Sequence, residues 1–519
     1  MKVLLAVFDY QEEQKKPWLT RISLLIIYFF GFFLWGKFMD WGNFPVNFED
    51  WSYVTAPRLA FLQDAVRSFQ FPLHMPDASA LLSQTDRFLS VPDVILSPQI
   101  ILTGWLGVQE FVLFNVLLLF TIGFLGLLAF RKKFTISLSG FFWVFLLFNF
   151  NGHILSHLAI GHAHWAGYFL FPWFMLFIFK FIEGDTSWRW VFSCSLVFFF
   201  VFLQGAYHQY VWMLMVLGII GLVYWRNFLG VLKVLVFANG LSMVRILPAV
   251  LLFGDFSEGF LGGYPLKRYM LETMIQMRAP QAGQAYPAFT NPLGYWEFNL
   301  YIGVLGVVFV VLFGGLILTF RQVLVASVHW SENFQAAEKR KRPGKVWHWL
   351  SIIQGWFLKL KIKSKNSNPR WLGLFVPIIL MGWFSIRDNF EIVSQFGIPL
   401  LSSERVATRF LLLSFLLLLF MAVKEYQWLL DQLRKFWPLQ VMLSGLSIVL
   451  AVDLWKHAML WKVSATAAVF PELELDLSAK VVANHSDPLY ISLIASGILL
   501  SGLTLLFLIR KMRQEVHLK

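Results

Sequence analysis

The chain has 519 residues, of which 58% are hydrophobic and only 14% are charged, whereas soluble domains carry about 25% charged residues. Its formal net charge is +13, but the basic residues gather in short loops between apolar runs, which is typical of membrane topology and argues against a nucleic-acid partner. The single cysteine, Cys194, excludes an intrachain disulfide and a thiolate metal cluster. The composition therefore predicts an all-α polytopic membrane protein.

Apolar runs of about 20 residues are what a lipid bilayer requires of a spanning helix. In chain order they predict about twelve transmembrane helices, at 19–38, 108–130, 134–151, 165–182, 190–206, 209–225, 228–253, 298–320, 371–387, 409–424, 438–456 and 489–509. The region 93–107 is predicted to be a re-entrant or interfacial piece.

The distribution of lysine and arginine predicts the orientation. The densest basic blocks lie in one long loop, at 321–370, and they belong on the cytoplasmic side under the positive-inside rule. Both termini are then cytoplasmic. The prediction is an N-terminal membrane module (1–320), a basic cytoplasmic loop (321–370) and a C-terminal membrane module (371–519), with the outer loops of the first module at 39–107, 152–164 and 254–297.

The first outer loop begins with two adjacent carboxylates, Glu49 and Asp50, about a dozen residues after the first span. At the depth of lipid head groups they could take a proton from an acceptor hydroxyl, or bind a divalent cation beside a phosphate. The alternative is that one of them caps the helix that follows. That helix is predicted to be amphipathic and to lie in the membrane interface, because apolar residues recur at spacings of three and four at Leu59, Leu62, Val66 and Phe69.

Four histidines fall within twelve residues at the second outer loop: His153, His157, His162 and His164. His153 and His157 are four residues apart, so they share a helix face, and neutral imidazole is a common metal ligand. Three interpretations stay open from the residues alone. The cluster could hold a divalent metal ion, contact the substrate, or only hydrogen-bond to head groups and loop backbone.

Cations form the third group on the outer side. Arg245 lies within the seventh span. A charge inside a membrane span is energetically costly, so Arg245 is a candidate functional residue. Arg405 and Arg409 are four residues apart before the tenth span, and the guanidinium fork suits phosphate oxygens. The alternative for this pair is snorkelling or pairing with Glu404. The remaining candidates for substrate binding are Lys267, Arg268, Tyr264 and His74.

Several nucleotide and hydrolase motifs are missing from the sequence. There is no phosphate-binding loop of the Walker type, no dinucleotide-binding glycine pattern and no Gly-x-Ser-x-Gly elbow. The loops are too short to contain a soluble catalytic domain. Any chemistry is therefore expected at the membrane face.

The order of these features resembles the GT-C superfamily of integral membrane glycosyltransferases, and more narrowly the bacterial proteins that glycosylate lipoteichoic acid and related envelope polymers. The phrases that carry the resemblance run through most of the chain. They are "FEDW", "SFQFPLH", "SPQIILTGWLG", "FRKKF", "FNFNGHILSHLAIGHAHWAGYFLFPWFML", "YIGVLGVVFVV" and "SERVATRF". The chain differs from the family pattern at His74, where a tryptophan is common, and at 77–86, where glycines are usual.

The resemblance implies an inverting transfer of a sugar from a polyprenyl-phosphate donor to a glycan, lipid or polymer acceptor. It implies the extracytoplasmic face of a bacterial inner membrane as the place of reaction. By analogy Asp50, with Glu49 beside it, acts as the base or as a ligand of a divalent metal. The alternatives are a transporter or flippase of a lipid-linked envelope precursor, and a non-catalytic membrane scaffold.

Overall fold

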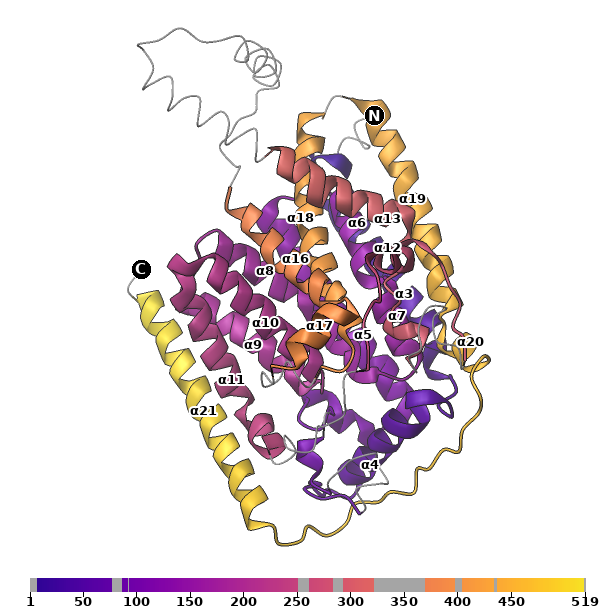
Figure 1. Cartoon of the computed structure of the whole chain (residues 1–519), viewed down its shortest axis with the longest axis vertical. Helices are drawn as coiled ribbons and strands as arrows, with labels where there is room; N and C mark the ends of the chain where they lie inside the picture. Colours follow the sequence, from indigo (N-terminus) through magenta and orange to yellow (C-terminus); the bar gives the residue numbers. More distant parts are fainter. Residues whose placement is uncertain are drawn as a thin grey trace.

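A computed structural model describes residues 7–76, 86–91, 93–250, 261–282, 293–321, 369–396, 404–433 and 436–517. Most of the predicted basic loop at 321–370, namely 322–368, and parts of the outer loop at 254–297 lie outside these ranges. The described residues form helices joined by short turns and extended segments, and they include no strand longer than an isolated bridge. Figure 1 shows the helices as one bundle, so the predicted all-α class is confirmed.

Nine helical stretches among the described residues are long and apolar enough to cross a membrane, and three more are apolar but shorter. The nine are Pro17–Phe38, Val108–Phe134, Leu138–Ala159, Ala163–Ile182, Trp225–Val250, Gly303–Arg321, Ala407–Gln432, Trp437–Leu460 and Pro488–Val516. The three are Trp188–Leu203, Tyr207–Val223 and Trp371–Phe384. Each of the twelve overlaps one predicted span, and the chain is a polytopic helical membrane protein.

The α-helices follow one another in the order drawn in Figure 1. They are α2 (Tyr10–Gln14), α3 (Pro17–Phe38), α4 (Ala56–Arg67), α5 (Val108–Phe134), α6 (Leu138–Asn149), α7 (Gly152–Ala159), α8 (Phe171–Ile182), α9 (Trp188–Leu203), α10 (Tyr207–Val223), α11 (Phe228–Val250), α12 (Lys267–Ile275), α13 (Gly303–Phe309), α16 (Phe375–Phe384), α17 (Arg387–Ser394), α18 (Leu411–Gln432), α19 (Trp437–Leu460), α20 (Val463–Ala467) and α21 (Pro488–His517).

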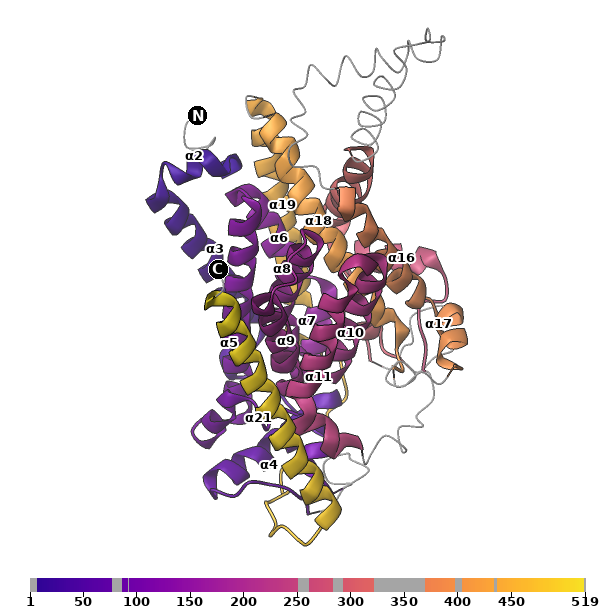
Figure 2. The same cartoon turned by 90° about the vertical axis from the view of Figure 1, so that its left-hand side faces the viewer.

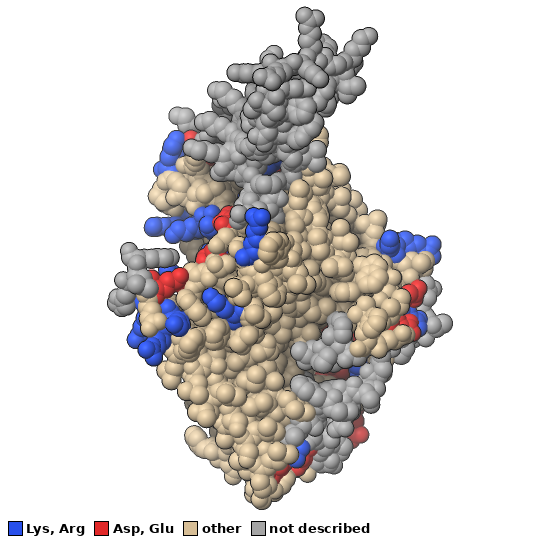
Figure 3. All heavy atoms as spheres, turned by 60° about the vertical axis from the view of Figure 1, so that its left-hand side comes forward, with Lys and Arg blue, Asp and Glu red and all other residues tan. Residues whose placement is uncertain are grey.

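The outermost long helix is α21, which lies along α11 in both views of the ribbon (Figures 1 and 2). Most of α21 is unburied, and its exposed side chains include Leu499, Leu503 and Leu506. The space-filling view shows a broad face with few charged residues below the clusters of lysine and arginine (Figure 3). An apolar surface of this extent is what lipid tails would cover in a membrane protein.

The second predicted outer loop, at 152–164, is largely helical instead. After α6 ends, the Asn151 side chain accepts a hydrogen bond from the backbone N–H of Ile154 and caps α7, whose eight residues are all buried. Gly152 is required at the start of α7, because a Cβ there would lie 2.1 Å from Oδ1 of Asn299. The polar residues that suggested a loop are thus part of the interior.

The amphipathic helix predicted after Glu49 and Asp50 is α4. Leu59 and Leu62 are buried as expected, but Phe69 lies beyond the end of α4 and is 97% exposed. The apolar stretch at 93–107 contains a 3₁₀ helix (Pro98–Gly104) that packs on α4 and does not form a long span. We call this end of the bundle, where α3 ends and α5 begins, the α4 end.

An extended segment at 471–487 connects α20 to α21 around the α4 end, and we call it the strap (Figure 1). Its backbone bonds to the first loop at two separate points: Leu473 N donates to Asn47 O at 2.7 Å, and Ser52 Oγ donates to Glu474 O at 2.7 Å. Further along, Asn484 holds the backbone of residues 71, 73 and 74. The strap therefore ties the segment between α20 and α21 to the first loop.

Candidate functional site

The backbone at Asp50 is fixed by a close approach of the turn after α7. Gly161 has φ +109°, and a Cβ on it would lie 2.3 Å from the backbone nitrogen of Trp51 and 2.7 Å from the carbonyl carbon of Asp50. Trp51 Nε1 donates to the Ala159 carbonyl at 2.9 Å, and Thr55 Oγ1 donates to that of Gly161 at 2.5 Å. Residues Trp51–Thr55 form a π-helical turn, a form that is frequent at functional sites.

The side chain of Asp50 bonds to His162 and does not cap the following helix. Its Oδ2 accepts a hydrogen bond from His162 Nε2, whereas the turn Trp51–Thr55 has no side-chain cap. Burial raises the pKa of the Asp50 carboxyl, but the charge and hydrogen bond of His162, followed by Arg409 and Arg58, outweigh it and leave that pKa below its ordinary value. Asp50 is therefore ionised at neutral pH.

Glu49, the other predicted carboxylate, is placed differently. It has a positive φ of 41°, which is uncommon outside glycine, and its side chain is partly buried. Burial and then the charge of Asp50 raise the pKa of its carboxyl. The two neighbouring acids thus have pKa values pushed in opposite directions, which is the pattern of paired carboxylates with different roles.

The four clustered histidines do come together, but unequally. His162 Nδ1 lies 2.7 Å from His157 Nδ1, and the His157 ring stacks on Trp165 with ring centroids 3.9 Å apart. His153 contacts His157 edge to face at 4.5 Å, and both rings are buried. His164 points to a separate small cavity. His153 and His157 are therefore interior residues and do not face head groups, whereas His162 and His164 are partly exposed.

The rings of His162 and His157 lie between two carboxylates. A carboxylate only accepts, so His162 donates to Asp50 from Nε2. His157 Nε2 lies 3.8 Å from Glu297 Oε2, which is within ion-pair range but too long for a hydrogen bond. The two rings meet through their Nδ1 atoms, one of which donates to the other.

Glu297 continues the line to Arg409. Arg409 donates from Nε and Nη2 to the two oxygens of Glu297 at 2.8 and 2.7 Å, a bidentate pair, and from Nη1 to Glu404 at 3.4 Å. All three side chains are at most 10% exposed. The sequence left pairing with Glu404 open as the alternative to a phosphate-binding role for Arg409, and the structure shows that pairing, with Glu297 as the closer partner.

Glu404 ends the line. It accepts hydrogen bonds from Trp212 Nε1 at 2.7 Å and His208 Nδ1 at 3.1 Å. Burial alone would raise the pKa of its carboxyl. The charge and hydrogen bond of His208, followed by Arg409 and Trp212, outweigh burial and lower that pKa from 4.5 to about 2. Asp50, His162, His157, Glu297, Arg409 and Glu404 thus form one line of alternating charged and polar groups, which we call the Asp50–Glu404 line.

A second group of charges lies on the other side of Asp50. Arg58 lines a cavity of about 40 Å³, together with Asp93, Asn115 and His164. Burial lowers the pKa of the Arg58 guanidinium, while Asp93 and then Asp50 oppose that effect. Asp93 also pairs with Arg245, which is fully buried, at 3.4 Å.

The remaining predicted residues lie in several places. Arg245 is held by the Val91 carbonyl at 2.6 Å and Tyr207 at 3.0 Å as well as by Asp93, so it is a buried counter-charge. Arg405 is half-buried and interacts electrostatically with Arg409 and Asp50.

The structure places Tyr264, Lys267, Arg268 and His74 in other contacts. Tyr264 is buried and donates to the Phe298 carbonyl at 2.7 Å. Lys267 and Arg268 are exposed at the start of α12, where Arg268 donates to the Tyr269 hydroxyl. His74 belongs to a different cluster at the strap, with Asp86 and His485.

The residues of this line could hold a cation after a small movement. His157, His162 and Glu297 bring one ligand atom each within 4.8 Å of one another. Two nitrogens bound to a tetrahedral metal at about 2.0–2.1 Å would lie about 3.3 Å apart, whereas those of His157 and His162 are 2.7 Å apart. A metal would therefore need the rings to separate by about half an ångström and would displace the proton between them.

Sequence reasoning missed Glu297, His208, Arg58 and Asp93 as site residues, and it treated Glu404 only as a partner of the arginines. One signal was present, since Glu297 lies directly before the apolar span at 298–320 and Glu404 lies five positions before the span at 409–424. A charge in that position needs a partner.

Comparison with known proteins gives no relative: no family description, no curated protein and no solved structure matches this chain.

Proposed function

We propose that the protein transfers a sugar from a polyprenyl-phosphate donor to an envelope acceptor at the α4 end of the bundle, on the extracytoplasmic side of the membrane. The observation that supports the proposal most is the Asp50–Glu404 line. This line joins an ionised, partly exposed carboxylate to buried histidines and ion pairs. Its first and last residues, Asp50 and Glu404, are 354 positions apart in the sequence. Buried charges arranged in this way are typical of catalytic sites.

Asp50 is the base in this proposal. Its side chain is 37% exposed, whereas that of His162 is only 12% exposed, so Asp50 stands between the solvent and the His162 ring. An acceptor hydroxyl would give its proton to Asp50 while its oxygen forms a bond to the anomeric carbon. His162 is a positioning residue, because its hydrogen bond orients the carboxylate.

The leaving group would be polyprenyl phosphate, which departs with the electron pair of the broken carbon–oxygen bond. Arg58 and Arg405 are the cations we assign to its phosphate, because both lie near enough to Asp50 to affect its ionisation or to be affected by it. Arg409 is less suited to bind phosphate, since its three nitrogens already bond to Glu297 and Glu404. The donor would arrive from the bilayer, since no soluble nucleotide site is expected.

A divalent metal is a second form of the same site. It would take the place of the proton shared by His157 and His162, with Glu297 as a further ligand, and it would leave Asp50 as the exposed base. When bound, such an ion would supply electrostatic stabilisation to the departing phosphate. Assays with and without a chelator separate the two forms.

The test uses the full-length protein in proteoliposomes with a panel of polyprenyl-phosphate hexoses, and it measures release of polyprenyl phosphate, a product that does not depend on the acceptor. Asp50→Asn should reduce release by at least about 100-fold, the usual contribution of a general base. Asp476→Asn is the matched control, because Asp476 is an exposed carboxylate of the strap that bonds only to Ser478 among the described residues.

Two outcomes would contradict the proposal. One is wild-type release by Asp50→Asn. The other is movement of intact donor between leaflets with no release, which would favour the transporter alternative. That alternative retains some support from the fully buried Arg245–Asp93 pair, because charges inside a membrane bundle also mark transport paths.

A further inference from the structure

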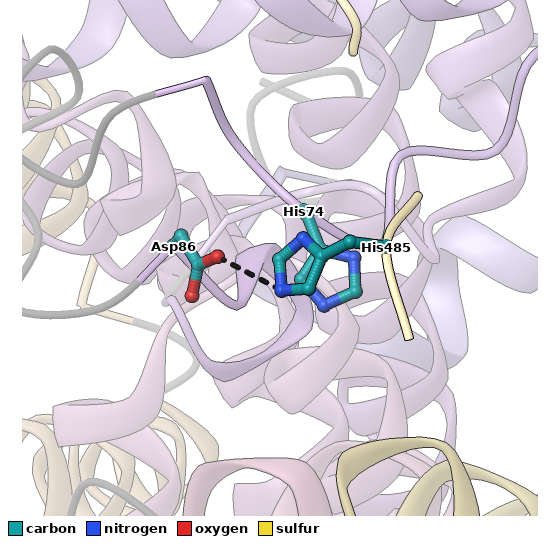
Figure 4. Close-up of side chains that lie close together, drawn as sticks. All are labelled: His74, Asp86 and His485. Carbon is teal, nitrogen blue, oxygen red and sulfur yellow. Dashed lines mark ion pairs between the residues drawn. The ribbon is translucent and has the colours of Figure 1, made fainter. Parts of the chain in front are cut away.

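A second cluster of histidine and carboxylate lies at the α4 end, where the strap meets the first loop. His74 comes from the first loop, Asp86 from the same loop twelve residues later, and His485 from the strap. Figure 4 shows the two imidazoles lying against each other with the Asp86 carboxylate directed at His485. One ligand atom from each residue lies within 4.8 Å of the others.

The strongest sign of a ligand here is the state of His74. Its side chain is fully buried, yet neither ring nitrogen has a well-formed hydrogen bond to a described residue; its polar neighbours are the Asn484 side chain and the Asp487 carboxylate, which lies 4.0 Å from Nε2. A buried polar group without a partner is destabilising, so such a group in a folded protein needs an explanation. Its position is nevertheless fixed, because the His74 backbone N–H bonds to Asn484 at 3.3 Å and its ring packs on Tyr490.

The charges around His74 also suit a cation. Asp86 lies 3.4 Å from His485 Nε2, and Asp487 lies 4.0 Å from His74 Nε2. Asp487 already accepts from Arg87 at 2.7 Å, so it is better placed to orient His74 than to bind the ion.

We propose that His74, Asp86 and His485 form a binding site for a divalent transition metal of the zinc type, which fastens the strap to the first loop. Two imidazoles and one carboxylate are a ligand set that zinc accepts, with water in the fourth position. His485 is 55% and Asp86 41% exposed, so the ion enters from solvent. The two rings now stack at 3.7 Å, and the more exposed His485 ring is the one that turns to bind.

The site would act on the position of α21. His485 lies three residues before α21 begins, and α21 packs along α11, which carries the buried Arg245. A metal that binds the folded protein but not the unfolded chain stabilises the folded state. The gain in free energy grows with the logarithm of one plus the ratio of metal concentration to Kd. The ion would therefore hold the strap closed without taking part in the reaction proposed above.

The test measures bound zinc per chain, after dialysis, in full-length protein purified in detergent. The variants are His485→Ala and Asp86→Asn, and His162→Ala reports on the other cation-binding candidate. We expect His485→Ala and Asp86→Asn each to bind one zinc ion fewer than wild type, while His162→Ala keeps the ion that those two variants lose. Cobalt should give a visible absorption band in wild type that is absent in His485→Ala.

A second measurement follows the strap directly. The Lys480 side chain is 69% exposed, so trypsin can cut the strap there when it opens. Zinc at ten times its Kd should slow this cleavage about tenfold in wild type, and leave it unchanged in His485→Ala. Asp476→Asn, on the same strap, should behave as wild type. The proposal is overturned if His485→Ala or Asp86→Asn retains the full zinc content, or if only His162→Ala loses zinc.

Discussion

Replacing Gly161 by alanine tests the geometry of the site with a single methyl group. Gly161 has φ +109°, a conformation that costs a residue with a side chain about 1–3 kcal/mol. The added Cβ would lie 2.3 Å from Trp51 N, whereas ordinary contact begins at 3.4 Å. The peptide between Asp50 and Trp51 would therefore have to move by about 1 Å.

That displacement should affect both stability and chemistry. Strain and overpacking together should destabilise the α4 end by about 2–5 kcal/mol. The Asp50 carboxylate would move with its peptide, and a misplacement of about 1 Å at a catalytic group costs about 100-fold in rate. The measurements are release of polyprenyl phosphate in proteoliposomes and thermal unfolding followed by tryptophan fluorescence.

The matched control is Gly218→Ala in α10, where a Cβ would meet nothing within 4 Å. Alanine favours a helix interior over glycine by about 1 kcal/mol, so this variant should be as active as wild type and at least as stable. Wild-type rate and unfolding temperature in Gly161→Ala would refute the assigned contact between Gly161 and the Asp50–Trp51 peptide.

Three further predictions concern the charged groups. Glu297→Gln should destabilise the protein by about 3–5 kcal/mol, because it leaves the buried Arg409 without its bidentate carboxylate. The control is Glu272→Gln, which breaks a more exposed ion pair made by α12 and should cost less than about 1 kcal/mol. Equal losses of stability in thermal unfolding would contradict the buried pair. Glu404 has a pKa lowered from 4.5 to about 2, so its ionised form stabilises the fold fully above about pH 4.5 and that contribution is lost as the pH falls toward 2. The difference in Tm between wild type and Glu404→Gln should therefore narrow from pH 5 to pH 3, and a constant difference would be evidence against the low pKa. Arg58→Ala should raise the KM for the polyprenyl-phosphate donor about tenfold or more, since a hydrogen bond to a charged group contributes about 1.5–3 kcal/mol, and an unchanged KM would remove Arg58 from the phosphate site.

The sequence was sufficient to predict the class of the protein and the approximate place of each membrane helix. A span depends on a local run of apolar side chains, and hydropathy can be read from neighbours along the chain. The sequence also indicated Asp50, the histidines and Arg409, because charged and polar residues beside apolar runs are conspicuous. Its failure at 152–159 has the same origin, since buried histidines and asparagine have the composition of a loop.

Only the tertiary structure decided which of these groups are partners. His162 meets Asp50 from 112 positions away, and Arg409 meets Glu297 from a further 112. No local pattern encodes such a pairing, because it depends on the packing of helices that are distant in the chain. The same packing brings His485 of the strap against His74 of the first loop. Hydrophobicity along the chain thus determined the helical bundle. Contacts between segments that are distant in the sequence determined the charge pairs.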